Sequence, residues 1–86
     1  MKRDILKKEI VKAIKRLKCS TKRPIVDKVI ENISKVREFT KLDMIAMVDF
    51  GWALQNLKGK GFIVNSNTHG CPNCNGKHGD TFWRMA

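Results

Sequence analysis

Two cysteines and two histidines stand within ten residues near the end of the sequence. His69, Cys71, Cys74 and His78 follow one another with one, two and three residues between them. Zinc prefers four thiolate or imidazole ligands arranged as a tetrahedron, and a Cys-x-x-Cys turn supplies two of them from a single bend. The spacing therefore predicts a zinc site in which Cys71 and Cys74 are the first two ligands, His78 is the third and His69 is the fourth.

Other chemistry remains open to the same four residues. Cys71 and Cys74 can instead form a disulfide or stay a free dithiol, and the two histidines can be surface residues that are partly protonated near a pH of about 6.5. Water or a second protomer can also supply the fourth zinc ligand. We expect no enzyme and no small-molecule substrate, because Asp80 is the only acid near the cluster and a hydrolytic zinc site needs a neighbouring general base.

The charge of the chain indicates a polyanionic partner. The 86 residues carry a net charge of +10, from 18 Lys and Arg against 8 Asp and Glu. This excess favours nucleic acid over a membrane, with a generic solvated surface as the alternative. No apolar run approaches the roughly 20 residues of a membrane span, and three cysteines suit a reducing compartment better than a disulfide framework. We therefore expect one cytoplasmic domain over residues 1–86.

The apolar pattern predicts three helices and a two-stranded β-hairpin, which is an α+β fold. Apolar residues recur at helical spacing over residues 4–18, 22–34 and 41–58. Thr40, with Asp43 three residues later, resembles a capping box at the start of the third helix. The side of this helix that we expect to face the core holds Leu42, Ala46, Phe50, Ala53, Leu54 and Leu57.

The hairpin is predicted from strands at about residues 61–65 and 80–85, with the cysteine and histidine loop at 66–79 between them. A loop of this length is uncommon in a small domain unless something orders it, and zinc would do so. Within the third helix, Gly51 lowers helix stability by about 1 kcal/mol relative to Ala. We attribute this glycine to the close approach of a neighbouring element.

Three helices followed by a hairpin is the order of a winged helix-turn-helix, and residues 51–63 sharpen the resemblance. This stretch resembles the third helix and first wing strand of winged-helix DNA-binding domains, and its Gly51-Trp-Ala-Leu54 start is similar to the N-terminal domain of Mrr-type restriction endonucleases. Trp83-Arg84-Met85 stands where the closing wing strand of such domains has Trp-Arg and an apolar residue, and residues 21–33 resemble their second helix. The resemblance covers most of the chain. It implies a winged-helix fold that binds duplex DNA. We expect no nuclease activity, because the resemblance does not extend to a nuclease domain.

In a winged helix the third helix enters the major groove. The start of the second helix and the wing would contact the DNA as well. This arrangement predicts DNA contacts by Lys22, Arg23, Lys41, Gln55, Asn56, Lys58, Lys60, Lys77 and Arg84. Gln and Asn can pair with adenine, whereas the cations give affinity without sequence information. The lysines of the first helix are expected to form a solvated face.

The exposed side of the third helix also carries apolar residues. Met44, Ile45, Val48 and Trp52 predict packing against the wing or against a second protomer. The sequence as a whole predicts a homodimeric DNA-binding regulator of transcription with a zinc-ordered wing. The alternative is a winged-helix interaction module that docks into a nucleoprotein complex.

Overall fold

The computed structural model describes residues 1–66 and 82–86, with the side chain of Ser66 left out. The predicted zinc ligands His69, Cys71, Cys74 and His78 lie outside the described residues, as does Lys77. The elements are α1 (Arg3–Leu17), β1 (Cys19–Ser20), α2 (Lys22–Val36), α3 (Lys41–Ala46), the 3₁₀ turn η1 (Met47–Asp49), α4 (Phe50–Gly59), β2 (Ile63–Ser66) and β3 (Phe82–Met85). The chain is a small α+β protein with a three-stranded antiparallel sheet in the part described.

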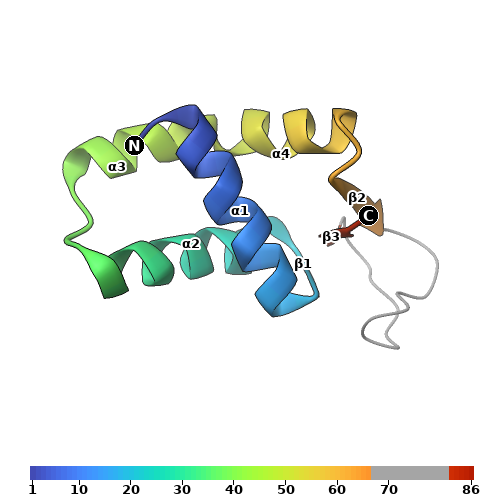
Figure 1. The fold of residues 1–86 in the computed structure, drawn as a ribbon, viewed down its shortest axis with the longest axis horizontal. Coiled ribbons are helices and arrows are strands. Elements are labelled where there is room, and N and C mark those ends of the chain that lie inside the picture. Colours follow the sequence, from blue (N-terminus) through green and yellow to red (C-terminus); the bar gives the residue numbers. More distant parts are fainter. Residues whose placement is uncertain (67–81) are drawn as a thin grey trace.

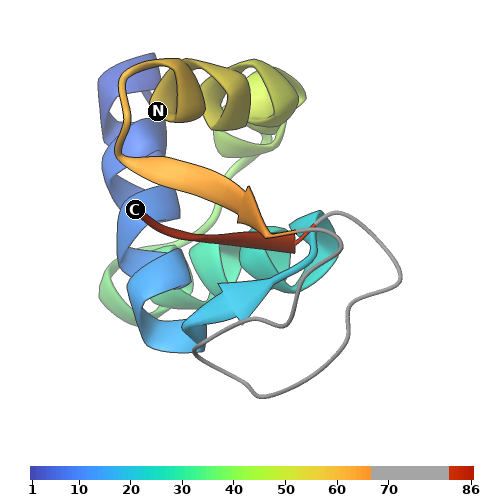
Figure 2. The same ribbon diagram turned by 90° about the vertical axis from the view of Figure 1, so that its right-hand side faces the viewer.

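Helix α1 is the centre of the helical layer. It lies across α2 on one side and α4 on the other, and these two helices run in roughly parallel directions, below and above α1 in Figure 1. The sheet closes one end of this layer, where β3 packs on α1 and β2 follows α4 (Figure 2). One face of the sheet therefore belongs to the core, and the start of α2 lies close to the sheet through β1.

One apolar core joins the helices to the sheet. The apolar stripes of the three long helices and the inner face of the sheet supply Leu6, Ile10, Ala13, Ile14, Ile25, Val29, Ile33, Phe50, Ala53, Leu54, Leu57, Ile63 and Trp83. The helical periodicity predicted the first two helices to within two residues at each end. This agreement follows from the burial of a full apolar stripe on each of them.

The prediction of a two-stranded hairpin was wrong by one strand. The short β1 pairs with β3, so that Cys19 lies opposite Arg84 and Ser20 opposite Trp83, and the strand order is β1-β3-β2. Two residues are too few to carry an alternating pattern, which is why the sequence did not indicate this strand. Lys18, with a φ of 70°, turns the chain out of α1 into it.

The first strand of the hairpin also begins later than predicted. Strand β2 starts at Ile63, because Gly61 adopts a φ of +81° in the turn that ends α4. The amide of Phe62 then donates to the carbonyl of Leu57 at 3.0 Å, which closes this turn. Strand β3 is described from Phe82, and residues 80 and 81 of the predicted strand lie outside the described part.

The single helix predicted over 41–58 is interrupted. Its capping box is confirmed, because the Thr40 hydroxyl accepts from the Asp43 amide at 3.4 Å and the Asp43 carboxylate accepts from the Thr40 amide at 2.9 Å. After α3, however, η1 replaces one turn of α-helix before α4 begins at Phe50. The predicted helix is therefore two helices joined by a tighter turn.

This interruption explains why Leu42 is not in the core. A 3₁₀ turn advances about 120° per residue instead of about 100°, so three such residues rotate α3 by about 60° relative to α4. The rotation carries Leu42 outward, where 72% of it is exposed, and brings Asp43 inward, where 2% is exposed. Ala46 is only half-buried for the same reason. The prediction for Leu42 was wrong because it assumed one unbroken helical period.

Candidate nucleic-acid interface

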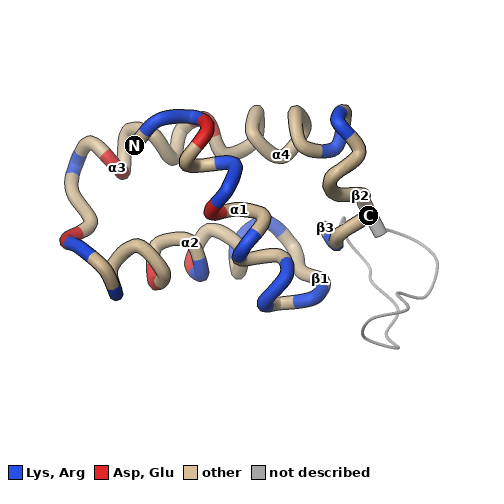
Figure 3. The backbone as a smooth tube through the Cα atoms, in the orientation of Figure 1, with Lys and Arg blue, Asp and Glu red and all other residues tan. Residues whose placement is uncertain are grey.

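The exposed cations are concentrated on three elements. Lys and Arg recur along α1 and at the end of α4 in Figure 3, and Lys22 and Arg23 are exposed in the first turn of α2. The candidate interface is the part of this surface where the cations at the start of α2 approach α4. Among the described residues these cations make no ion pair, although Asp27 lines the same surface depression as Lys22 and Arg23.

The first turn of α2 places positive charge where folding alone does not favour it. The turn contains Lys22 and Arg23 and no acid, and Thr21 at the N-cap makes no side-chain capping bond. Free amides give the start of a helix partial positive charge, which attracts anions and disfavours cations. Lys22, Arg23 and the helix end therefore form one electropositive site.

Gly51 brings this site next to α4. A Cβ atom added at Gly51 would lie 3.6 Å from the Lys22 Nζ, which is ordinary van der Waals contact. The predicted close approach at this glycine is therefore made by the end of a flexible side chain and not by another backbone. Gln55 and Lys58 stand four and seven residues after Gly51, so they share its face of the helix. We call Lys22, Arg23, Gln55 and Lys58 the basic face.

The other exposed side of α4 is occupied by α1. The guanidinium of Arg3 lies 4.6 Å from the ring centroid of Trp52, and its Nε donates to Asp49 at 3.1 Å. Lys7 places its Nζ 5.8 Å from the same ring and donates to the Asn56 side-chain oxygen at 3.3 Å. We call these five residues the Trp52 cluster. Within the described residues, Trp52 packs against α1, a partner that the sequence did not indicate, and 43% of the residue stays exposed.

The remaining predicted DNA contacts are dispersed. Lys41 starts α3 at the end of the molecule away from the sheet (Figure 1), and Asn56 belongs to the Trp52 cluster. Lys60 lines a groove with residues of α1. Arg84 is half-buried on β3, donates from Nη1 to the Met85 carbonyl at 3.3 Å, and has a buried Nε without a hydrogen-bond partner. Of the predicted set, the structure places Lys22 beside the face of α4 that holds Gln55 and Lys58, and Arg23 follows Lys22 in the first turn of α2.

A second ionic cluster fixes α3 to the end of α2. Arg37 donates to both carboxylate oxygens of Asp43, at 2.6 and 2.9 Å, and the Met1 amino group lies 3.6 Å from the same carboxylate. The Arg37 and Thr40 hydrogen bonds hold the pKa of Asp43 well below its ordinary value, and the pKa of Arg37 is raised in turn. This pair is structural, because it keeps α3 in its rotated position.

The sequence did not indicate Arg3, Lys7 or Arg37 as important residues. Arg3 and Lys7 meet α4 across more than forty positions of chain, which no local pattern encodes. Arg37 stands six residues before Asp43, and a cation that close to a capping box was the one available signal.

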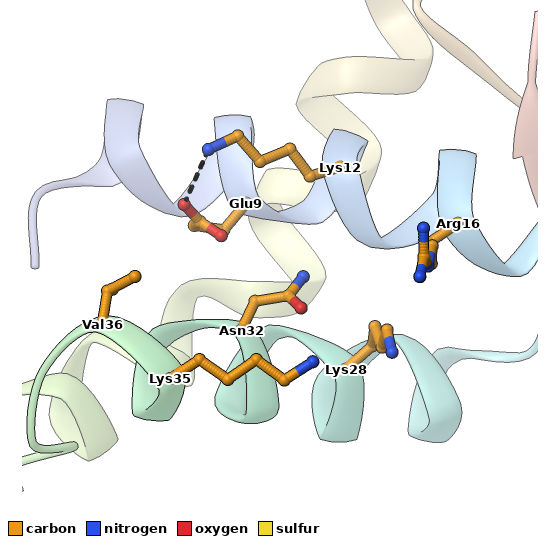
Figure 4. A pocket seen from close by; sticks show the side chains of 7 residues that line it. All are labelled: Glu9, Lys12, Arg16, Lys28, Asn32, Lys35 and Val36. Atoms are coloured by element: carbon orange, nitrogen blue, oxygen red, sulfur yellow. Dashed lines mark hydrogen bonds and ion pairs between the residues drawn. The ribbon is translucent and has the colours of Figure 1, made fainter.

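A cleft of about 380 Å³ between α1 and α2 is a weaker candidate for anion binding. Its cations include Lys12, Arg16, Lys28 and Lys35, and Asn32 extends into it from α2 (Figure 4). Glu9 forms an ion pair with Lys12 at 3.4 Å, and Glu31 forms ion pairs with Lys28 and Lys35 at 3.2 and 3.1 Å. The hydrogen bonds from Lys35 and Lys28 lower the pKa of Glu31. Three of the four cations named here are therefore already paired, and two carboxylates offset half of their positive charge.

Large apolar side chains are exposed on α3 and on η1, which follows it. Leu42, Met44, Ile45 and Val48 all have more than half of their surface exposed, and Val48 reaches 83%. We call these four residues the α3 apolar patch. The packing predicted for Met44, Ile45 and Val48 is absent among the residues that the structure describes.

The described part of the chain contains neither a group of metal-binding side chains nor a helix that could span a membrane. No group of three His, Cys, Asp or Glu side chains there could hold a metal ion, and the predicted zinc ligands lie outside it. Over the same residues, no helix is both long and apolar enough to cross a membrane.

No protein-family model, curated protein or solved structure matches the chain.

Proposed function

We propose that the protein binds duplex DNA with its basic face. The observation that carries the proposal is the approach of Lys22, at the start of α2, to Gly51 of α4. This approach places the electropositive start of α2 beside the face of α4 that carries the Gln55 amide and the Lys58 ammonium group. Lys22, Arg23 and Lys58 would bind phosphates, and Gln55 would read a base edge, as glutamine does with adenine.

The order and pairing of the elements support a winged-helix form of this proposal. A short strand after the first helix and a closing strand between two others give the order β1-β3-β2. In this arrangement α4 takes the place of the recognition helix, and β2 and β3 form the wing. The Trp52 cluster would then orient α4 from the side that faces away from DNA.

Zinc and self-association are part of the same proposal. Cys71 and Cys74, with His78 and His69, would bind one zinc ion and order the wing. The α3 apolar patch would be the contact surface of a homodimer, which suits a regulator of transcription that reads two half-sites. Metal analysis of protein purified without added zinc tests the zinc site. Light scattering of Val48→Asp tests the homodimer, and we expect this variant to lose the dimer.

DNA binding is tested by a pair of matched double variants. Lys22→Ala/Arg23→Ala removes two charges from the basic face, and Lys8→Ala/Lys15→Ala removes two from α1. We expect the first variant to bind a mixed-sequence duplex about tenfold more weakly and the second to lose about twofold. The logarithm of the binding constant should fall with the logarithm of salt with a slope of about −3 for three phosphate contacts, and about −1 in the first variant.

The same experiment separates readout from phosphate binding. Gln55→Ala should weaken binding to the preferred sequence by about tenfold and leave mixed-sequence binding unchanged. Equal losses in the two double variants would place DNA elsewhere and overturn the proposal.

The α3 apolar patch favours a second candidate function. An exposed apolar surface on a small protein marks a contact with another protein, so the chain could dock into a nucleoprotein complex through α3. In that case Val48→Asp abolishes incorporation into the complex, while duplex DNA alone is bound weakly and without sequence preference.

A further inference from the structure

A groove of about 600 Å³ lies between α1, the end of α4 and the base of the hairpin. We call it the lysine groove, and the residues that matter for its chemistry are Lys8, Val11, Lys15, Lys60, Phe62 and Met85. Its volume falls within the range of about 300–1,000 Å³ that ligand pockets occupy. Lys60 directly follows α4 and stands two positions after Lys58, which corresponds to a rotation of about 200° about a helix axis, so the two lysines leave this end of α4 on opposite sides. The lysine groove is therefore distinct from the basic face.

The floor of the groove is apolar and open. Phe62 is 54% exposed, and Val11 and Met85 are half-buried. Leu57 belongs to the core and completes the floor. An exposed phenylalanine beside two further apolar side chains is a surface that gains free energy when a partner covers it.

The rim of the groove is basic and uncompensated. Within the described part of the chain, Lys8, Lys15 and Lys60 make no ion pair, unlike Lys12, which is paired with Glu9. Among the described residues that line the groove, Asp4 is the one acid, and its Oδ1 lies 3.7 Å from the Nζ of Lys7. The groove thus presents three free cations around an apolar floor.

This combination does not suit a nucleic acid. A phosphate backbone gains nothing from an apolar floor. Single-stranded bases need aromatic platforms, and among the described residues of the groove Phe62 is the one aromatic side chain. All the rim cations are lysines, which act as flexible point charges and lack the planar fork that arginine offers to phosphate. The observations favour a ligand with apolar side chains between carboxylates.

We propose that the lysine groove binds an acidic amphipathic segment of a partner protein. An apolar side chain of the segment would cover Phe62, Val11 and Met85, and its carboxylates would pair with Lys8, Lys15 and Lys60. Lys8, Val11 and Lys15 lie three and four residues apart along one stripe of α1, which is about 10 Å long and matches two turns of a bound helix. The proposal does not rest on DNA binding.

The probe for this site is a fluorescein-labelled 16-residue peptide with Leu at helical spacing and Glu elsewhere. Its control is a peptide of the same composition in which the leucines are scattered. We expect the amphipathic peptide to bind at least about tenfold more tightly than the control in fluorescence anisotropy. Equal affinity for the two peptides would reduce the interaction to charge alone and overturn the proposal.

Two variants and a matched control locate the binding. Phe62→Ser and Lys8→Glu/Lys15→Glu should each weaken the amphipathic peptide by about tenfold, whereas Lys35→Glu/Lys41→Glu, which reverses two charges at the far end of the molecule, should change it by less than about threefold. Circular dichroism confirms that each variant is folded. Equal loss in both charge-reversal variants, or none in Phe62→Ser, would overturn the site.

A membrane and the proposed DNA contact are separated in the same series. Binding to phosphatidylserine vesicles that Phe62→Ser abolishes, without binding of the amphipathic peptide, would assign the groove to a lipid surface and overturn the proposal. Phe62→Ser should leave the affinity for duplex DNA unchanged, so failure of the peptide experiment leaves the basic face untouched.

Discussion

The two exposed sides of α4 use positive charge in opposite ways. On the side of α1, Arg3 and Lys7 contact Asp49, Trp52 and Asn56, so each cation has a partner within the chain. On the side of α2, Lys22 lies beside Gly51 and makes no ion pair among the described residues, and no acid stands in the first turn of that helix. The comparison teaches that cations with internal partners hold the fold, whereas those without are available to a polyanion.

The largest expected loss of stability comes from breaking the ion pair between Arg37 and Asp43, in which both carboxylate oxygens accept hydrogen bonds. Asp43→Asn keeps the size of the side chain but removes the charge that Arg37 and the Thr40 amide bind. We expect the free energy of unfolding, measured with urea, to fall by more than the roughly 1 kcal/mol that Thr40→Ala removes as a capping residue. A smaller loss in Asp43→Asn than in Thr40→Ala would show that the Arg37 pair does not anchor α3.

The same carboxylate predicts how stability depends on pH. Hydrogen bonds from Arg37 and from the Thr40 amide lower the pKa of folded Asp43 below the value of about 3.9 in an unfolded chain. A carboxylate of this kind contributes stability that is complete above its unfolded pKa and is lost as pH falls toward its folded pKa. The urea concentration at the unfolding midpoint should therefore change little between pH 7 and pH 5. It should decrease once the pH is lowered past about 4.

Asp43→Asn isolates this effect from the general repulsion among the many cations in acid. The difference in unfolding free energy between the two proteins should narrow as pH falls from about 5 to about 2. A difference that stays constant over that range would mean that Asp43 has an ordinary pKa in the folded protein.

Trp52→Ala tests the α1 side of the comparison. The ring is 43% exposed, so its truncation removes part of a hydrophobic contact and two cation–π contacts. We expect the unfolding free energy to fall by about 1–2 kcal/mol and the affinity of the folded protein for duplex DNA to change by less than about threefold. Lost DNA affinity in a protein of unchanged stability would move Trp52 from the fold to the interface.

The helices that bury a regular stripe could be predicted from the sequence, and the contacts between distant segments could not. Residues 4–18 and 22–34 show one period throughout, and α1 and α2 follow them closely. The period of the third predicted helix is broken by η1, and its sequence contains no glycine or proline at Met47–Asp49 to indicate this. The rotation depends on Arg37 and Asp43, whose pairing is a tertiary interaction.

The candidate site divides in the same way. Lys22, Arg23, Gln55 and Lys58 could be named because a helix start and one helix face are local features of the sequence. That Asn56 turns instead to Lys7, and that Lys60 lines a groove with α1, depends on the packing of α1 against α4. The lysines of α1 were predicted to form one solvated face, but the packing of the hairpin beside them gives part of that face an apolar floor.

Gly51→Ala has the smallest expected effect and tests the α2 side directly. The added methyl group would meet the Lys22 Nζ at 3.6 Å, so no atom needs to move. Alanine restricts the unfolded chain and favours the helix, and we expect the unfolding free energy to rise by about 0.5–1 kcal/mol. Gly61→Ala is the control with the opposite sign, because Gly61 has a φ of +81° that alanine adopts only with strain. A loss of stability in Gly51→Ala would mean that α2 and α4 pack tightly here, and the basic face would then belong to the fold rather than to a partner.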